Sequence, residues 1–143
     1  MKLSTRSRYG TRLMLELAQH YTEGPIPLGD IAKRQDVSVK YLEQIIIPLK
    51  RAHYIESVRG PKGGHILIKP PEEITVGEIV VLLEEGTSLV ECIEDTTVCE
   101  RADICPTRLL WKEVSEAMLN KLQTVTLADL VQKANALENK GFK

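Results

Sequence analysis

The three cysteines are the residues whose type and spacing most directly suggest chemistry. Cys92, Cys99 and Cys105 are separated by six and by five residues. An odd number of cysteines crowded into 14 positions is a poor pattern for a secreted disulfide framework. Thiolates are soft ligands for zinc and for iron–sulfur clusters alike, and these spacings differ from the C-x2-C pair of a structural zinc site. The spacing therefore indicates ligands or sensors without naming the metal.

The same cysteines have two simpler interpretations. Free cysteine is often a small buried hydrophobe, and two of the three could form a reversible disulfide that leaves one thiol over. Acidic side chains near the thiols outnumber the basic Arg101: they are Glu91, Glu94, Asp95, Glu100 and Asp103. We expect this negative charge to make the thiols resist ionisation unless a bound cation reverses the preference.

The histidines give no support to an enzymatic function. His20, His53 and His65 form no His-x3-His pair, and the sequence has no evident Ser/His/Asp set or glycine-rich phosphate loop. We therefore expect that the protein is not an enzyme. A small metalloenzyme is the distant alternative.

The net charge of −1 conceals a strong asymmetry along the chain. Residues 1–70 contain 12 Lys and Arg against 6 Asp and Glu, whereas residues 71–143 contain 7 against 14. The two halves thus carry formal charges of +6 and −7. Although the sum argues against a nucleic-acid partner, the basic half is suited to one.

Composition and hydropathy are those of a globular protein. Hydrophobic residues make up 43% of the chain and charged residues 27%, close to ordinary averages. No apolar stretch approaches the roughly 20 residues that a membrane span requires. The first residues also lack the apolar run of a signal peptide. We expect a cytoplasmic protein that does not contact a membrane.

Apolar residues at helical spacing predict three short helices in the basic half. One apolar stripe covers residues 9–21, a second helix lies within 28–37, and Ser38 is a suitable N-cap for the third. Pro48 lies inside the third pattern, and we expect it to kink or divide that helix. Strand-like residues follow on both sides of a glycine-rich turn at 59–64.

Three helices followed by a hairpin describe a winged helix-turn-helix, whose third helix enters the major groove of DNA while the wing approaches the backbone or minor groove. On the third helix, the residues expected to face DNA are Ser38, Lys40, Tyr41, Glu43 and Gln44. At the tip of the wing they are Arg59, Gly60, Pro61 and Lys62.

Each of these residue types suits its proposed role. The Ser38 hydroxyl and the free N–H groups of the helix start can bind phosphate, and Glu43 can accept from a cytosine amino group. Arg59 suits a narrow minor groove, and the glycines of the tip allow the backbone to approach closely. The alternative is a merely solvated basic face in which the glycines serve the turn and Tyr41 packs on its neighbours.

The acidic half is predicted to be helical on both sides of the cysteines. Thr75 and Thr126 each precede an acidic residue by three positions, which is the pattern of a capping box. A long helix from Thr107 carries an apolar stripe that needs a partner. The expected fold is mainly α, a winged helix-turn-helix with a two-stranded wing plus a long C-terminal dimerisation helix. The expected divisions are a DNA-binding domain (1–85), a cysteine-bearing sensor loop (86–106) and a dimerisation region (107–143).

Most of the chain resembles the Rrf-type (Rrf-two) winged-helix transcription regulators, and among them the family's iron–sulfur cluster regulators. The matching stretches are MKLSTRSRYGTRLMLELA, SVKYLEQIIIPLKRAHYIESVRGPKGG, ITVGEIV, the three cysteines, LLW and TLADLV. The resemblance implies a homodimer joined by the helix from Thr107. Its two recognition helices would meet successive major grooves about 34 Å apart, which implies double-stranded DNA with a palindromic operator.

The resemblance also implies that Cys92, Cys99 and Cys105 ligate an iron–sulfur cluster, with a [2Fe–2S] cluster expected ahead of a [4Fe–4S] one. Where the family's cluster regulators carry a histidine three residues after the last cysteine, this chain has Arg108, which cannot serve as a ligand. The fourth ligand is open among the three histidines, a loop carboxylate, the partner subunit and a small thiol.

The expected function is that of a dimeric DNA-binding transcription regulator acting as a repressor. It would sense iron–sulfur cluster supply, iron or an oxidant through the cysteines. The alternative is a cluster-free regulator of sulfur metabolism that is controlled by thiol oxidation or by a partner protein.

Overall fold

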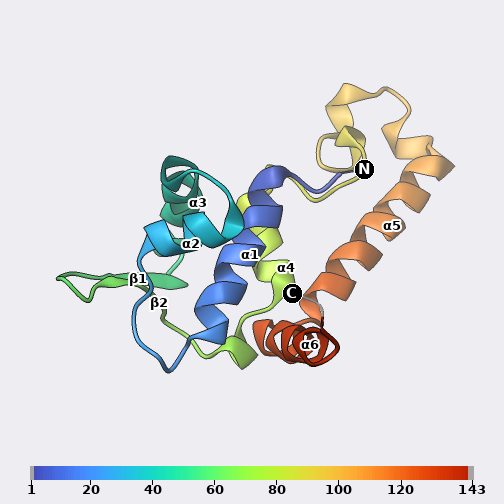
Figure 1. Cartoon of the computed structure of the whole chain (residues 1–143). Helices are drawn as coiled ribbons and strands as arrows, with labels where there is room; N and C mark the ends of the chain where they lie inside the picture. Colours follow the sequence, from blue (N-terminus) through green and yellow to red (C-terminus); the bar gives the residue numbers. More distant parts are fainter. Residues whose placement is uncertain (1, 142–143) are drawn as a thin grey trace.

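The computed structural model describes residues 2–141, which are mainly helical (Figure 1). The helices are α1 (Thr5–Gln19), α2 (Leu28–Gln35), α3 (Val39–Arg51), α4 (Val76–Leu83), α5 (Pro106–Gln123) and α6 (Leu127–Asn139). One antiparallel sheet pairs β1 (Ile55–Val58) with β2 (Gly64–Leu67). Short 3-10 turns lie at Pro71–Glu73, Glu91–Ile93, Thr96–Val98 and Ala102–Ile104. The expected fold class is confirmed.

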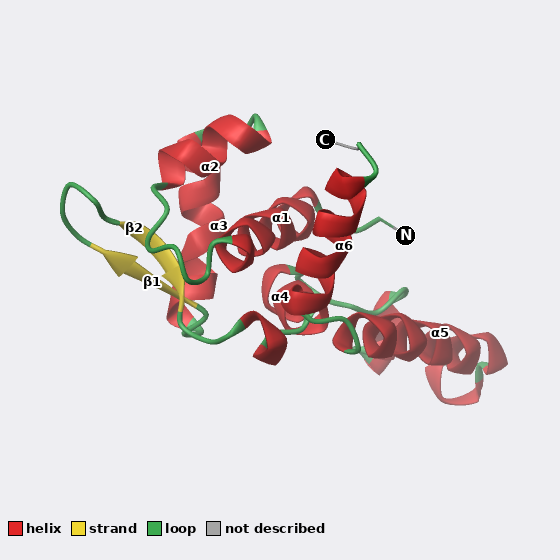
Figure 2. Cartoon of the chain, turned by 60° about the horizontal axis from the view of Figure 1, so that its bottom comes forward, coloured by secondary structure: helices red, strands yellow, loops and turns green. Residues whose placement is uncertain are grey.

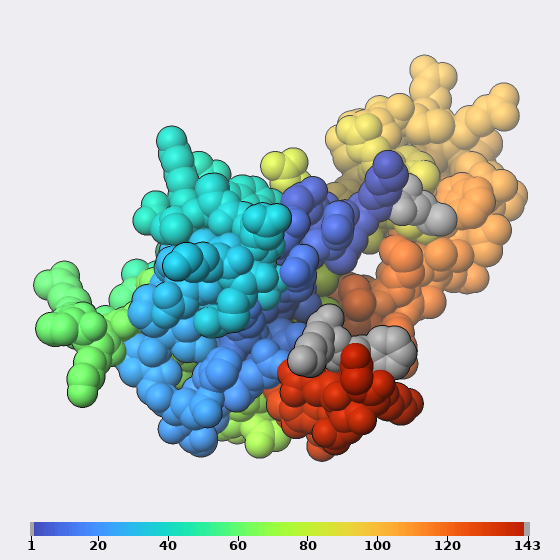
Figure 3. Space-filling view, viewed as in Figure 1, coloured from blue at the N-terminus to red at the C-terminus, as the bar shows by residue number. Residues whose placement is uncertain are grey.

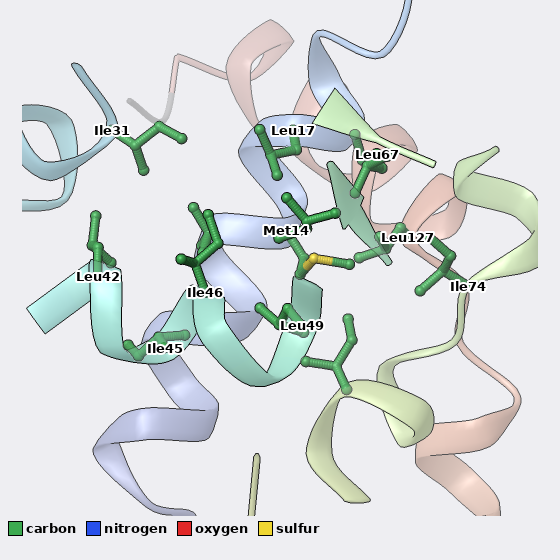
Figure 4. Packing of buried hydrophobic residues seen from close by; sticks show 14 of the residues in the cluster. Met14, Leu17, Ile31, Leu42, Ile45, Ile46, Leu49, Leu67, Ile74 and Leu127 are labelled. Carbon is green, nitrogen blue, oxygen red and sulfur yellow. The ribbon is translucent and has the colours of Figure 1, made fainter. Parts of the chain in front are cut away.

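Helices α1 to α4 and the two strands form the part that we call the head, and they pack around one apolar core (Figure 4). Its fully buried side chains include Leu13, Met14, Ile31, Leu42, Ile45 and Leu49. Burying a side chain of this size contributes about 1.5–3 kcal/mol. The spacing of these residues along each helix is the one from which the helices were predicted, so periodicity and packing agree.

The third helix starts where the sequence predicts, because the Ser38 Oγ accepts the backbone N–H of Tyr41 at 3.1 Å. Pro48 does not divide this helix, which continues to Arg51. Proline removes only the one backbone bond that Gln44 would otherwise accept. Buried Ile46 and Leu49, on either side of Pro48, keep the helix packed on the core.

A buried carboxylate fixes α2 against α1. Glu16 of α1 is only 7% exposed and accepts hydrogen bonds from Arg34 and Gln35 at the end of α2. The Arg34 Nε and Nη2 atoms lie 2.9 and 2.8 Å from the carboxylate Oε2. Such a pair sets the angle between the two helices, because a buried carboxylate without a partner would be costly.

The wing is attached to the head at its base. Its register pairs Ile55 with Leu67 and Val58 with Gly64. On the other edge of β2, the backbone of His65 exchanges two hydrogen bonds, of 3.1 and 2.9 Å, with Ile26. Ile26 lies in the connection between α1 and α2. The wing tip is therefore free while its base is held.

Both predicted capping boxes are present, Thr75 with Glu78 at α4 and Thr126 with Asp129 at α6. Helix α6 returns from α5 to pack against α1, and Leu127 at its start is fully buried in the core of the head. The division of the chain at residues 85 and 106 stays a prediction. The structure adds that α6 packs on the head, although it follows α5 in sequence.

Helix α5 projects away from the head and carries the three 3-10 turns at its outer end, on the side of the molecule away from the wing (Figures 1 and 2). A groove of about 830 Å³ lies between α5, α4, the N-terminal arm and residues 86–89. The space-filling view shows this hollow beside the N-terminal arm (Figure 3). None of the helices in residues 2–141 is long and apolar enough to cross a bilayer.

Candidate DNA interface and cysteine segment

The predicted contact residues of α3 lie on its outer face. Ser38, Lys40, Glu43 and Gln44 are all exposed. The Ser38 oxygen is occupied in capping α3, but its hydroxyl hydrogen is still available to a phosphate oxygen. These four side chains can therefore reach DNA without any change in the core behind them.

Tyr41 is placed differently from these four residues. Its side chain is half-buried, and its ring meets the ring of Tyr9 edge-on, with centroids 6.0 Å apart and an interplanar angle of 87°. The Arg12 guanidinium lies 5.2 Å from the centroid of the Tyr9 ring. Tyr41 thus packs on α1, and Tyr9 with Arg12 supports the recognition helix from behind.

Sequence reasoning did not assign this supporting role to Tyr9 and Arg12. They stand three positions apart on α1, so they share one face of that helix. An aromatic residue and an arginine at this spacing were a signal for a cation–π pair. Nothing in the sequence indicated that the pair would meet Tyr41, since that contact depends on the crossing of α1 and α3.

The tip of the wing presents Arg59, Gly60, Pro61 and Lys62, all of them exposed. Gly60 has a φ of 110°, which lies in the region that favours glycine. The turn is closed by a hydrogen bond of 2.9 Å from the Gly63 N–H to the Gly60 carbonyl.

The other two glycines of the tip serve the fold. A Cβ on Gly63 would stand 2.1 Å from the Val58 carbonyl oxygen, and one on Gly64 would stand 2.3 Å from the Ile26 carbonyl carbon. At these two positions the fold itself requires glycine, which agrees with the alternative that the glycines serve the turn, and the approach of the wing to DNA stays a prediction. Only Gly60 has open space around it at the tip.

The basic side chains of the candidate interface are not neutralised by the protein. In residues 2–141, no ion pair engages Lys40, Arg59 or Lys62. The wing, which carries Arg59 and Lys62 between its two strands, extends from the head on the side away from α5 (Figure 1). The arrangement suits a polyanion such as DNA.

The cysteines lie at the other end of the molecule, on the cysteine segment, residues 86–106. Cys92 is half-buried in the turn Glu91–Ile93, Cys99 is exposed after the turn Thr96–Val98, and Cys105 is half-buried as the N-cap of α5. All three are free thiols. Within the described chain, no group of three or more His, Cys, Asp or Glu side chains is arranged to hold a metal ion.

Arg108 holds the first cysteine turn against α5. Its Nε donates a hydrogen bond of 2.8 Å to the Cys92 carbonyl oxygen, and its side chain is half-buried. The residue that stands where a ligand was expected therefore binds the backbone of a neighbouring cysteine.

The environment of Cys105 differs from the one expected. The Thr107 hydroxyl, 3.2 Å from the Cys105 Sγ, and then the Arg108 backbone N–H lower the pKa of this thiol. The expectation that the thiols resist ionisation is thus wrong for Cys105. Hydrogen bonds at the start of α5, assisted by the charge of Arg101, outweigh the opposing effect of desolvation on this thiol.

The cysteine segment fits an iron–sulfur cluster by the chemistry of its donors. It supplies three thiols, and the successive 3-10 turns beside them contact one another. Few of its side chains are buried, so little packing would resist a rearrangement. A cluster would require the three sulfur atoms to be drawn together.

Taken together, the winged helix-turn-helix and its exposed basic face define a DNA-binding protein of the winged-helix class. The family model described as "Iron-dependent Transcriptional regulator", Rrf2, matches residues 3–133. The chain belongs to this family. It is a DNA-binding transcription regulator and not an enzyme.

Two relatives with similar sequences agree with this assignment. "Protein rrf2" of Nitratidesulfovibrio vulgaris is 50% identical over 94% of this chain and 90% of its own length. The regulator IscR of Serratia proteamaculans is 39% identical over 96% of this chain and 83% of its own length.

Solved structures give the same fold from two kinds of regulator. The T. potens IscR structure has a TM-score of 0.78 and 38% identity, and the match covers 94% of this chain and 88% of that one. CymR, the global cysteine regulator of B. subtilis, has a TM-score of 0.78 and 40% identity, and the match covers 93% of this chain and 98% of that one.

Proposed function

We propose that the protein is a homodimeric repressor that binds a palindromic operator and senses iron–sulfur cluster, iron or oxidant status through its cysteines. The observation that carries this proposal is the position of three free thiols, on one irregular segment between the head and α5. A change in that segment can alter how α5, and with it a second subunit, is placed relative to the head. Such a regulator acts on DNA in the cytoplasm.

The contact with DNA divides into two parts. Ser38, Lys40, Glu43 and Gln44 enter the major groove with Tyr41 at its edge, while the wing tip reaches the minor groove. Of the tip residues, Arg59 suits a narrow minor groove and Lys62 a phosphate, while Gly60 and Pro61 shape the turn. Their exposure and the absence of competing ion pairs in residues 2–141 support this assignment.

The homodimer is supported by the apolar face of α5. The exposed large apolar side chains of this helix are Leu109, Leu110, Trp111 and Met118. The groove beside α5 is lined mainly by apolar atoms, from residues that include Leu3, Val80, Val114 and Leu122. Exposed apolar surface of this extent indicates a protein interface, and a second copy of α5 would bring the same apolar surface to a two-fold symmetric contact.

In the proposed holo form, Cys92, Cys99 and Cys105 would hold the cluster, and Arg108 would not. The cluster would supply a redox-active, oxygen-sensitive group whose ligation fixes the segment. The fourth ligand then comes from outside these three thiols. A [2Fe–2S] cluster is proposed ahead of [4Fe–4S], and ordering of the segment would change the relative placement of the two recognition helices.

The second candidate is a cluster-free regulator of sulfur metabolism that responds to thiol oxidation or to a partner protein. It is favoured by the similarity to CymR, of which an oxidised form from Staphylococcus aureus matches with a TM-score of 0.75 and 39% identity. It is also compatible with the placement of the three cysteines, which do not form a metal-binding group within residues 2–141.

Anaerobic purification, an absorption spectrum and iron and sulfide analysis test the proposal, together with binding to an operator selected from random duplexes. We expect a coloured, iron-containing dimer that loses its iron when Cys92 is replaced by alanine. A colourless, iron-free dimer with full operator affinity would refute cluster sensing. If peroxide then changed both the thiol masses and the operator affinity, the second candidate would stand.

A further inference from the structure

Residues 84–92 connect the end of α4 to the first cysteine and have almost no regular structure. In the described chain, residues 85–90 donate no hydrogen bond to another backbone group. This segment, which we call the strap, is instead held by two side chains of α5 and by the side chain of its own Glu84. An extended segment fixed at a few points can transmit a displacement from one end to the other.

Two side chains of α5 hold the outer half of the strap. The Ser115 Oγ accepts the Leu89 N–H at 2.9 Å while its own hydroxyl donates to the Trp111 carbonyl at 2.8 Å. Arg108 binds the Cys92 carbonyl. Positions 108 and 115 are seven residues apart, two turns of one helical face, so residues 89–92 lie along that face.

Ser115 is the one buried residue of α5, only 7% exposed. Its hydroxyl has one donor and is already committed to Trp111, so the oxygen is oriented toward Leu89. The hydrogen bond from Leu89 is thus shielded from water, and its geometry is fixed by the bond from Ser115 to Trp111. Ser115 is therefore suited to position residue 89 on α5.

Glu84 holds the inner end of the strap to the head. Its Oε1 accepts the backbone N–H of Ser4, the N-cap of α1, at 2.8 Å. Burial alone would raise the pKa of Glu84, but hydrogen bonds from Ser7 and from Ser4 outweigh it and lower the pKa. The carboxylate is therefore charged at neutral pH, which strengthens the bond.

The first turn of α1 leads on to the recognition helix. Ser4 also caps α1 by accepting the Ser7 N–H at 3.0 Å. One turn further along α1, Tyr9 meets Tyr41 of α3. A continuous set of contacts thus joins the Cys92 turn, the strap, α1 and α3.

We propose that residues 84–92 form a coupling strap between the cysteine segment and the DNA-reading head, with Ser115 and Arg108 as positioning residues on α5 and Glu84 as the anchor on α1. Its use in metal sensing rests on the proposed function, but the mechanical connection itself does not. Drawing Cys92 toward the other thiols would pull its carbonyl from Arg108, and the strap would pass that movement to Ser4.

Amide hydrogen exchange of the metal-free full chain tests the connection. Ser115→Ala should raise exchange about fivefold at the Leu89 amide, the effect of losing one typical hydrogen bond, and should also raise exchange in the distant first turn of α1, residues 4–8. Thr124→Ala is the matched control, because it removes a hydroxyl that binds the Lys121 carbonyl at the end of the same helix. We expect no change at residues 4–8 in that variant.

Glu84→Ala, which removes the acceptor of the Ser4 N–H, distinguishes coupling from local loosening. It should raise exchange at residues 4–8, and adding Ser115→Ala to it should raise exchange there no further, since the connection is already cut. Additive effects at residues 4–8, or a Ser115→Ala effect confined to residues 86–93, would overturn the proposal. If Ser115→Ala does not fold, Arg108→Ala should give the same pattern.

Operator binding separates this proposal from the proposed function. In wild type, cluster loading should change operator affinity, and Glu84→Ala should bring the ratio of loaded to metal-free affinity toward one while iron content stays the same. If wild type shows no response to iron, the sensing function fails, and the exchange measurements still decide whether the strap exists.

Discussion

The two ends of the molecule are built in opposite ways. The head is held by a continuous apolar core with hydrogen-bonded caps at α1, α3 and α4, and the side chains proposed to contact DNA stand on a regular helix and a turn. The cysteine segment has one buried apolar residue, Ala102, and is secured by single hydrogen bonds from α5. The helices of the head are therefore firmly held, whereas the cysteine segment can rearrange at low cost.

The largest expected effect is on stability, in one matched pair of truncations. Leu49→Ala in the core should lower the free energy of unfolding by about 2–5 kcal/mol, because it leaves a cavity. Ile104→Ala in the cysteine segment should change it by less than about 0.5 kcal/mol, because Ile104 is 79% exposed. Denaturant unfolding measures both values. Equal losses would show that the segment is as firmly packed as the head.

The wing offers the next largest effect. Gly63→Ala places a Cβ against the Val58 carbonyl, so the turn must open, and operator affinity should fall about tenfold or more. Gly29→Ala in α2 has open space around the new Cβ and should be neutral or slightly stabilising. Gel-shift titration and thermal unfolding compare the two. Unchanged operator binding by Gly63→Ala would mean that the shape of the wing does not matter.

A single charge at the wing tip should have a moderate and specific effect. Arg59→Ala should weaken operator binding by about 1–3 kcal/mol. If Arg59 contacts only phosphate, the slope of the logarithm of the binding constant against the logarithm of salt concentration should fall in magnitude by about one. The sequence preference should then change little. Lys140→Ala, on an exposed lysine after α6, is the control and should bind like wild type. A salt series of binding isotherms separates these results.

The smallest effect is a pH dependence at the base of the wing. Burial, and then the charge of Lys50, lower the pKa of His65 below its usual 6.5. The unfolded chain therefore takes up the proton first, so this contribution to stability is present above about pH 6.5 and is lost as pH falls below it. Between pH 7.5 and 5.5, the midpoint temperature of thermal unfolding should fall more steeply for wild type than for His65→Asn. The exposed His53→Asn variant should follow wild type, and identical slopes for all three would contradict the inference.

Prediction from the sequence succeeded where local signals and packing agree. The periodicity of residues such as Leu42, Ile45 and Leu49 determines both a helix and its buried face, and the caps at Ser38, Thr75 and Thr126 are local hydrogen bonds. Most of the fold was therefore predictable.

The parts that were missed depend on contacts between distant residues. The pairing of Arg108 with Cys92, of Ser115 with Leu89 and of Tyr9 with Tyr41 requires the crossing of separate elements. The cost of a Cβ on Gly63 or Gly64 likewise became visible only when the neighbouring carbonyls were located. The cysteine and DNA-contact residues themselves stay predictions.

The most direct test of metal-dependent DNA binding compares one preparation in two states. The anaerobically purified protein is split into a cluster-loaded and a metal-free sample, and operator affinity is measured for both at the same salt concentration. We predict a difference of about 5- to 150-fold, the usual range of coupling between two sites, which disappears in Cys92→Ala. Equal affinities of the two samples would contradict the proposal that the cysteine segment controls the head.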